Sequence, residues 1–478
     1  MEFPAVSERD RGRQRHTPAR RPRRWPCLLA LALFAVDPVS ASSHDGTKWQ
    51  IGVGRRVITP QTPVWLAGYG TKRVPDGKIH DLWAKVLALK APDGKRVVLA
   101  TTDHMGMSKT IYDGLYAEIN RRFGVRRDEF MLTFSHNHCG PLLKDDLVDY
   151  YPLDDEQRRL VDEYSGWMAD QVIKAVGEAL AAWQPAQLLH GEGLCTFAVN
   201  RRENTEQEVP RLRAEGKPLK GVVDHYVPVL AVRSGSGKLL ALLFGYACHP
   251  TTLSFNTWCG DYPGFAQVNL EAAYGGTSAM FFNACGADQN PIPRLKLELA
   301  ERYGAMLSQA VKEAVARPMR PVSPGLQSAF MFVDLPYEKL VTRETLLPVA
   351  KGESQLHARW ANRMLKRLEE GIVLPTSYPY PVEAWQLGSE LLFIGIGGEA
   401  VVDYSLRFKR EFGPTTWVCG YANDMVAYIP SRRVWEEGGY EGGPHLDEYG
   451  RPAWRWAGDV EDRVAGAVRE VVRQVRAK

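Results

Sequence analysis

The sequence is poor in the features that mark membrane, disulfide-rich and nucleic-acid-binding proteins. Outside its N-terminal region the 478-residue chain has no uninterrupted apolar run near the ~18 residues of a membrane-spanning helix. It has only seven cysteines and no C-x-x-C motif, which excludes a small disulfide scaffold and leaves a cysteine-rich zinc module unsupported. Residues 1–41 carry eight of the 60 basic and four of the 56 acidic residues, so the remainder is electrically balanced. A balanced body lacks the positive field of a nucleic-acid-binding protein, and we expect no nucleic-acid partner.

The N-terminus has the pattern of a secretory signal peptide. The basic segment RRPRR (residues 20–24) precedes the apolar run CLLALALFAV (27–36), and VSA (39–41) offers a cleavage site. We therefore expect a signal peptide over residues 1–41, a mature domain over 42–478, and a periplasmic or secreted protein without a stable membrane span. An uncleaved short anchor is the alternative. Six cysteines remain after cleavage, and the sequence cannot choose among their possible pairings.

The rest of the chain alternates short apolar runs with amphipathic stretches. This pattern predicts a mixed α/β fold in which helices pack on β-sheets. We find no internal repeat, and residues 203–220 are polar and rich in turn formers, which predicts a surface excursion. The expected strands include residues 97–100, 130–134, 239–247, 279–282 and 391–396, and the expected helices are 110–123, 155–183, 298–316, 354–369, 400–411 and 458–475.

A His-x-His motif follows the first strongly predicted buried strand. His136 and His138 lie in SHNHCGP (residues 135–141), directly after FMLTF. In an extended segment, residues two apart project to the same face, so both imidazoles would point the same way. Two such imidazoles are suited to binding a metal, although a surface histidine pair is the alternative.

Three more candidate residues also lie at or after predicted strand ends. His249 follows one strand, Glu399 follows another, and Tyr428 precedes Ile-Pro. Each has a structural alternative: a core histidine, a carboxylate that compensates a helix dipole, and a packed tyrosine. Side chains from several strand ends commonly converge on one edge of a sheet, and two histidines with a carboxylate would suit zinc with an open position for water.

A series of collinear motifs resembles the neutral/alkaline (non-lysosomal) ceramidase family. They are GVGRRVITP (52–60), AGYG (67–70), SHNHCGP (135–141), VNRR (199–202), HPT (249–251), GDYPG (260–264), Gly398-Glu399 and Tyr428. The resemblance implies an α/β zinc amidohydrolase domain, which in that family cleaves the N-acyl bond of ceramide, and for this chain a small-molecule acyl substrate that is lipid-like or soluble. It also implies a ceramidase N-terminal-domain-like fold of mixed β-sheets packed with helices, here without the family's C-terminal β-rich domain.

The resemblance also assigns roles to single residues. Carried over by position, His136, His249, Glu399 and Tyr428 would bind Zn²⁺. His138 would lie beside the metal, and Tyr440 would lie near the scissile carbonyl, which makes both candidate catalytic residues.

One segment departs from the family pattern. GADQNP (286–291) replaces the family's GDVSPN, so Gln289 stands where the ceramidases have a functionally important serine. Glutamine can hydrogen-bond a substrate but cannot act as a nucleophile, and Gln289 is our third candidate catalytic residue. The metal chemistry therefore transfers better than the substrate. The alternatives are a zinc esterase or deacylase acting on a carbohydrate or another soluble acyl compound, and a non-catalytic relative. We expect long-chain ceramide to be a poor substrate.

Overall fold

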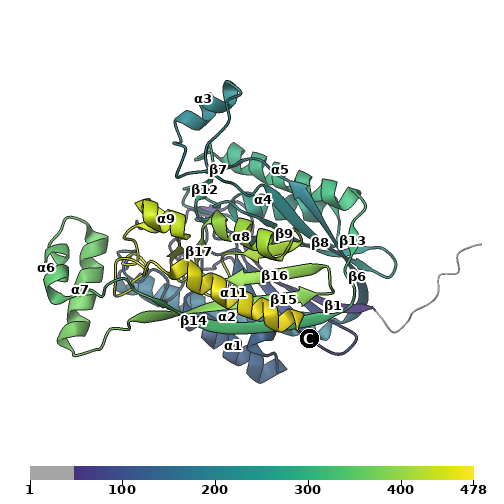
Figure 1. Ribbon diagram of the computed structural model, residues 1–478, viewed down its shortest axis with the longest axis horizontal. Coiled ribbons are helices and arrows are strands. Elements are labelled where there is room, and N and C mark those ends of the chain that lie inside the picture. The colour runs from purple at the N-terminus through teal and green to yellow at the C-terminus, as the bar shows by residue number, and fades with distance from the viewer. Residues whose placement is uncertain (1–47, 478) are drawn as a thin grey trace, which may run out of the picture. The chain divides into compact units, whose positions relative to one another are not determined.

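The computed structural model describes residues 48–477, and all of these residues belong to one unit. The expected signal peptide, residues 1–41, lies outside the described residues. Two β-sheets packed face to face form the centre of this unit, and helices cover their outer faces (Figure 1).

The larger sheet has nine strands in the order β11-β9-β8-β6-β1-β3-β4-β5, with β13 added beside β6. Most neighbours are antiparallel, but β4 with β5 and β9 with β11 are parallel, so the sheet is mixed. Its strands are β1 (Trp49–Val57), β3 (Trp83–Lys90), β4 (Arg96–Thr102), β5 (Phe130–Phe134), β6 (Gln184–Leu194), β8 (Tyr226–Ser234), β9 (Leu239–Tyr246), β11 (Ser278–Asn283) and β13 (Arg320–Pro321).

The smaller sheet has the order β14-β15-β16-β18, and three two-stranded ladders supplement the two sheets. Its strands are β14 (Leu326–Pro336), β15 (Ser377–Leu387), β16 (Leu391–Ile396) and β18 (Thr416–Cys419). The ladders pair β2 (Gly77–Lys78) with β10 (Thr257–Trp258), β7 (Ala198–Asn200) with β12 (Gln289–Pro291), and β17 (Glu399–Ala400) with β19 (Tyr428–Ile429).

Eleven α-helices and one 3₁₀ turn (Arg127–Glu129) complete the described part of the chain. The helices are α1 (Lys109–Phe123), α2 (Asp155–Ala181), α3 (Glu208–Ala214), α4 (Asp261–Ala273), α5 (Leu297–Ala316), α6 (Arg343–Ala350), α7 (Gln355–Glu369), α8 (Val402–Phe412), α9 (Arg432–Glu437), α10 (Gly439–Gly442) and α11 (Val460–Arg476).

Separate apolar clusters hold these layers together. One face of the large sheet packs against α1 and α2 in one half and against α4 and α5 in the other. The opposite face packs on the small sheet, whose outer face is covered by α8 and the valine stripe of α11. Glycines 52 and 54 of β1 permit the close approach of α2, because a Cβ atom at Gly52 would lie 1.7 Å from the carbonyl oxygen of Ala179. The packing of α2 on β1 therefore explains the two glycines of the GVGRRVITP motif (52–60).

The structure confirms the mixed α/β architecture and the elements expected from the sequence. The six helices expected from periodicity correspond to α1, α2, α5, α7, α8 and α11, with ends that differ by no more than two residues. Residues 203–220 form the expected excursion, which carries α3 and projects at the top of Figure 1. The six cysteines from Cys139 onward are all buried free thiols.

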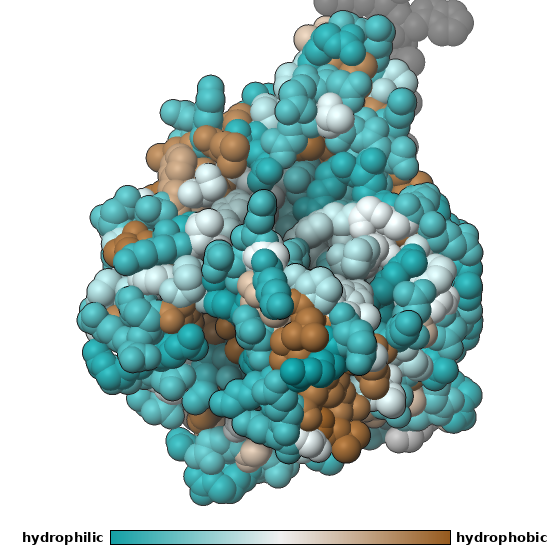
Figure 2. All heavy atoms as spheres, turned by 90° about the vertical axis from the view of Figure 1, so that its left-hand side faces the viewer, coloured by the Kyte–Doolittle hydropathy of each residue, from teal (hydrophilic) through white to brown (hydrophobic). Residues whose placement is uncertain are grey.

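The surface on the side of α6, α7 and α9 is mostly hydrophilic, with separate hydrophobic patches (Figure 2). Among residues 48–477, no helix combines the length and the apolarity that crossing a bilayer requires.

Candidate metal centre

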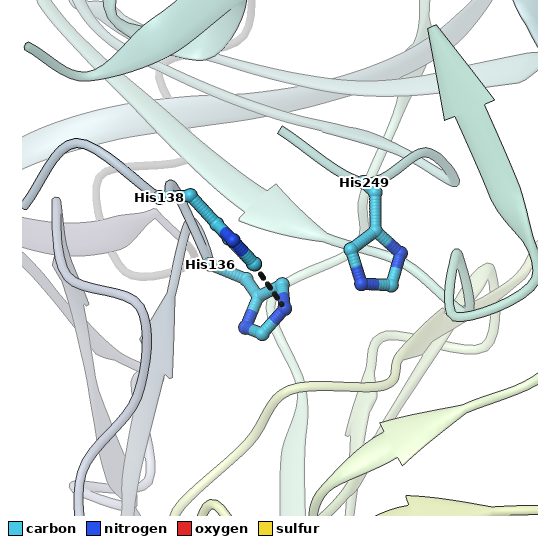
Figure 3. A group of neighbouring side chains, drawn as sticks. All are labelled: His136, His138 and His249. Carbon is cyan, nitrogen blue, oxygen red and sulfur yellow. Dashed lines mark hydrogen bonds between the residues drawn. The ribbon is translucent and has the colours of Figure 1, made fainter. Parts of the chain in front are cut away.

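Three histidines from two loops converge at the edge where β5 and β9 end. His136 and His138 follow β5, and His249 follows β9 (Figure 3). One ring nitrogen of each lies within 4.8 Å of the corresponding nitrogens of the other two. His136 and His249 are fully buried and His138 is half-buried. The arrangement is a group of nitrogen ligands that could hold a metal ion.

The backbone around His136 differs from the extended segment that we expected. His136 has a φ of 62°, in the left-handed region, so its imidazole and that of His138 do not project from one face of a strand. The two rings still approach each other, with 3.4 Å between their Nε2 atoms. A turn rather than strand alternation therefore brings the two imidazoles together.

Backbone carbonyl groups fix the orientation of two of these rings. The Nδ1 atom of His136 lies 2.7 Å from the carbonyl oxygen of Met105, and Nδ1 of His249 lies 2.9 Å from that of Gly286. Because Nδ1 must donate in each contact, Nε2 carries no proton when the ring is neutral, and in both rings it faces the cluster. This is the tautomer that a metal-binding histidine requires.

Glu399 reaches the same point from the β17–β19 ladder. Its Oε2 atom lies 3.1 Å from Nε2 of His136 and 2.9 Å from Nε2 of His249, and neither contact forms a well-directed hydrogen bond. Its Oε1 atom accepts a hydrogen bond of 2.5 Å from the Tyr449 hydroxyl. Glu399 precedes α8, which begins at Val402, so it does not occupy the first turn of that helix.

The electrostatics of the cluster favour an ionised Glu399 beside neutral imidazoles at His138 and His249. Burial alone would raise the pKa of Glu399, but the neighbouring His136 and His249 lower this pKa well below its usual value. Burial lowers the pKa of His249 to about 4, and burial together with the two other imidazoles lowers the pKa of His138 well below its usual value. Glu399 therefore supplies negative charge while His138 and His249 remain neutral near pH 7.

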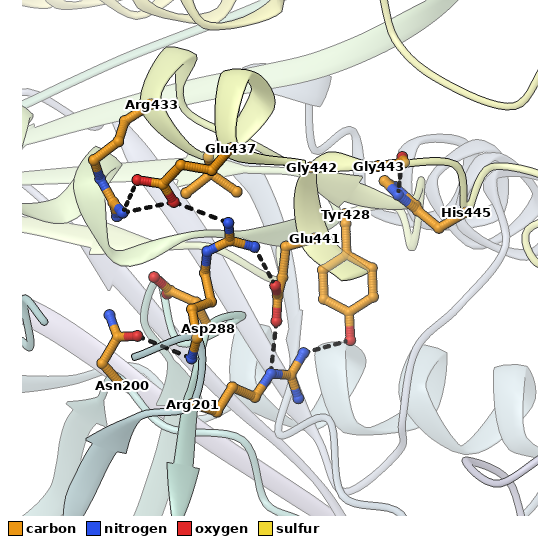
Figure 4. A network of polar contacts seen from close by, with 12 residues as sticks. Asn200, Arg201, Asp288, Tyr428, Arg433, Glu437, Glu441, Gly442, Gly443 and His445 are labelled. Atoms are coloured by element: carbon orange, nitrogen blue, oxygen red, sulfur yellow. Dashed lines mark hydrogen bonds and ion pairs between the residues drawn. The ribbon is translucent and has the colours of Figure 1, made fainter. Parts of the chain in front are cut away.

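Tyr428 also approaches Nε2 of His249 and is held by an arginine. Register in the β17–β19 ladder places Tyr428 opposite Glu399, and its hydroxyl lies 3.5 Å from Nε2 of His249. Arg201 donates to the Tyr428 hydroxyl at 3.0 Å, and Glu441 accepts from Arg201 at 2.7 Å (Figure 4). A buried ion pair thus orients the tyrosine toward the cluster.

Tyr440 and Gln289 lie in different surroundings. The Tyr440 ring packs edge-on against Tyr428 with centroids 5.1 Å apart, and its hydroxyl donates to Glu448. Gln289 is fully buried, and its amide bridges backbone groups: it donates to the Ala247 carbonyl at 2.7 Å and accepts from the Asp224 N–H at 3.2 Å. Tyr440 therefore borders the site, whereas the Gln289 side chain braces the chain that precedes His249.

The donor set suits a bound cation. With both rings neutral and protonated at Nδ1, Nε2 of His136, Nε2 of His249 and Oε2 of Glu399 would all be hydrogen-bond acceptors, and they face one another across about 3 Å. The buried Oε2 of Glu399 has no hydrogen-bond partner among the described residues. A metal ion between these atoms would satisfy all three.

Tyr449 and the Arg201–Glu441 pair were missed as functional residues by the sequence reasoning. Arg201 lies in the VNRR motif, which the resemblance contained without a role for it. Tyr449 and Glu441 have no local signal, because their partners lie 50 and 240 positions away along the chain, respectively.

Comparison with known proteins agrees with the expected resemblance. No protein-family model matches the chain. Neutral ceramidase of Pseudomonas aeruginosa is 21% identical in an alignment 490 positions long, which covers 88% of this chain and 72% of that protein. The crystal structure of neutral ceramidase from Pseudomonas aeruginosa has a TM-score of 0.67 at 19% identity, and the match covers 89% of this chain and 75% of that chain. A ceramidase complexed with C2 has a TM-score of 0.71 at 17% identity, with coverages of 90% and 76%. The chain is thus a distant homologue of neutral ceramidase, and its mixed α/β fold matches that of the ceramidase structures.

Proposed function

We propose that the protein is a zinc-dependent hydrolase that cleaves an amide (N-acyl) bond, with His136, His249, Glu399 and Tyr428 as the zinc ligands. The observation that carries this proposal is the convergence of the Nε2 atoms of His136 and His249 on a buried carboxylate oxygen, while Nδ1 of each ring is bound to a backbone carbonyl group. Histidine and carboxylate ligands are typical of catalytic zinc sites that retain an open position. The distant homology to neutral ceramidase supports the same chemistry.

A bound zinc ion would polarise the acyl carbonyl and lower the pKa of water toward ~7. The residues around it would position the reaction. His138, which is neutral and adjacent to His136, would accept or donate a proton at Nε2. The Tyr440 hydroxyl would donate to the carbonyl oxygen as negative charge develops there. Arg201 would hold the Tyr428 hydroxyl in place.

A hydrolysis screen with metal analysis tests the proposal. Purified protein should contain about one zinc per chain, and it should hydrolyse N-acyl substrates in a reaction that a chelator abolishes and added zinc restores. An N-acyl anilide and its O-acyl analogue distinguish an amidase from an esterase. Zinc without hydrolysis of any acyl compound would indicate a non-catalytic relative, and the absence of both would refute the proposal.

Long-chain ceramide should be a poorer substrate than short, soluble acyl compounds. Gln289 stands at the position of the family serine, and its amide is occupied by backbone groups. A hydrogen bond lost at a buried polar group costs ~1–3 kcal/mol, which corresponds to ~5- to 150-fold in kcat/KM. Ceramide in mixed micelles that is cleaved as well as every soluble compound would contradict this expectation.

We further propose that the protein is exported and that the mature chain begins near Ser42. The support is the basic, apolar and small-residue pattern of residues 20–41. Amino-terminal sequencing of protein recovered outside the cytoplasm tests this proposal, and an intact arginine-rich terminus would contradict it.

A further inference from the structure

A large cavity, lined mainly by residues with polar side chains, adjoins the candidate metal centre. Its volume is about 770 Å³, within the range of small-molecule sites. Arg201 and Tyr440 line it, and both also contact Tyr428. Arg201 and Tyr440 therefore separate the cavity from the metal centre. A substrate bound in the cavity would have its amide bond near the histidine cluster.

Most residues that line the cavity have polar or charged side chains, although the carbon atoms of these residues also expose apolar surface to it. Only two of its twelve lining residues, Ile292 and Gly439, lack a polar side chain. Four carboxylates line the cavity, and four guanidinium groups line it or pair with them: Arg201 with Glu441, Arg202 with Glu437 and Glu441, Arg294 with Glu206, and Arg433 with Glu437. An acyl chain bound here would displace water from these ion pairs and could not form the hydrogen bonds that the water had formed. A neutral molecule with many hydroxyl groups could form those hydrogen bonds in place of water.

Two lining groups are free to bind such a molecule. Glu203 is exposed and makes no hydrogen bond or ion pair with any residue in the range 48–477, so its carboxylate is an available acceptor. Asn290 is 6% exposed, and its Oδ1 atom accepts from Arg201 at 3.3 Å. Its Nδ2 atom has no partner in the same range and is an available donor. A vicinal diol or an amide can pair with both kinds of group.

The wall of the cavity is held in place before any ligand binds. Glu203 begins the excursion of residues 203–220, and Asn204 ties the two ends of this excursion together. The Asn204 amide donates to the Asn200 and Lys220 carbonyl groups at 2.8 Å each and accepts from the Lys220 N–H at 3.0 Å. Arg213 of α3 donates to the Ile292 carbonyl at 2.6 Å. Preorganisation of this kind reduces the entropic cost of binding.

We infer that this cavity binds the hydroxylated, amine-side part of the substrate, and that the substrate is an N-acylated amino sugar. This inference rests on the proposed amide hydrolysis. In the reaction, water adds its oxygen to the acyl carbon, the C–N bond breaks, and the amino sugar leaves as an amine that takes up a proton. The products are a carboxylate and the amino sugar. Residues 203–206, at the start of the excursion, would thereby contribute to specificity.

Two measurements test the inference, with N-acetylglucosamine as the probe. The first is binding of N-acetylglucosamine to chelator-treated protein by ligand-observed NMR, which does not require activity. The second is the ratio of kcat/KM for N-acetylglucosamine to that for an N-acetyl anilide. Glu203→Ala removes the free acceptor, whereas the control Glu215→Ala removes an exposed carboxylate at the end of α3, outside the cavity lining.

We expect Glu203→Ala to weaken binding and to lower the ratio by about tenfold, which is typical of a lost hydrogen bond to a charged group. Glu215→Ala should change neither. Absence of sugar binding, or equal values for Glu203→Ala and Glu215→Ala, would overturn the inference even if the anilide is hydrolysed. Sugar binding that depends on Glu203 in a protein that hydrolyses no acyl compound would instead uphold the cavity assignment and refute the proposed function.

Discussion

Gly68→Ala should displace His138 and reduce turnover while leaving the zinc ligands intact. Gly68 has a φ of 113°, and a Cβ atom there would lie 2.4 Å from Nδ1 and 2.5 Å from Cγ of His138. Ordinary contacts to a Cβ atom begin near 3.4 Å. The imidazole must therefore move by about 1 Å, and a misplacement of about 1 Å in a catalytic site can cost about 100-fold in rate.

The surroundings of His138 offer little resistance to this movement. Its buried Nδ1 has no hydrogen-bond partner among the described residues, and its ring is held by edge-on contacts with Tyr69 and His136. Because His136, His249 and Glu399 are untouched, the zinc content should stay close to that of the unaltered protein. The loss should therefore appear in kcat.

Gly77→Ala is the matched control for backbone strain. Gly77 has a φ of 151°, and a Cβ atom there would meet only Thr257 Cγ2 at 3.9 Å. Both substitutions place a side chain in an unfavourable backbone region, at a cost of about 1–3 kcal/mol each. Anilide hydrolysis, zinc content and Tm should be measured for both variants. Turnover in Gly68→Ala within twofold of that in Gly77→Ala would refute the positioning role of His138.

Further predictions concern the ligands and the buried acids. His249→Ala should lose zinc and activity together, and a full zinc content in the folded variant would contradict its role. Tyr440→Phe should retain zinc but lower kcat, because only a donor to the carbonyl is lost; unchanged kcat would exclude that role. Tyr449→Phe removes a donor from Glu399, so the pKa of this carboxyl should rise, and zinc affinity should fall about 10- to 100-fold, most strongly at acidic pH, in a metal titration between pH 5 and 8. Burial raises the pKa of Asp288 from 3.8 to about 7, so between about pH 4 and about pH 7 the folded state binds more protons than the unfolded state, and stability falls as pH rises through this range. Asp288→Asn should reduce this fall in the free energy of unfolding by about 1.4 kcal/mol for each unit of pKa shift. If urea unfolding at pH 5 and 8 gives the same change in unfolding free energy for the variant and the unaltered protein, the assignment is contradicted.

Local periodicity was sufficient to predict much of the fold. The valine stripe of α11 and the apolar runs of β5 and β16 each encode their own structure, because one face or the whole element is buried. The pairing of the strands was not predictable in the same way. The order of the nine-stranded sheet depends on contacts between strands far apart in sequence, and no pattern within β6 specifies β1 and β8 as its neighbours.

The candidate site shows the same division between local and long-range information. The sequence indicated His136, His138, His249, Glu399 and Tyr428 because each lies at the end of a recognisable run or within a motif. It misjudged the backbone of His136, since a left-handed residue leaves no periodic signal. The β17–β19 ladder has only two residues in each strand, too few for alternation to be visible, yet its register sets Glu399 opposite Tyr428. Ala400 and Ile429 of this ladder are buried in the apolar cluster of the small sheet, α8 and α11, and the Glu399 N–H donates to the Ala427 carbonyl. The chemistry of the site therefore depends on the folded core more than on the motifs themselves, and substitutions that shift this ladder should impair zinc binding even where every ligand is retained.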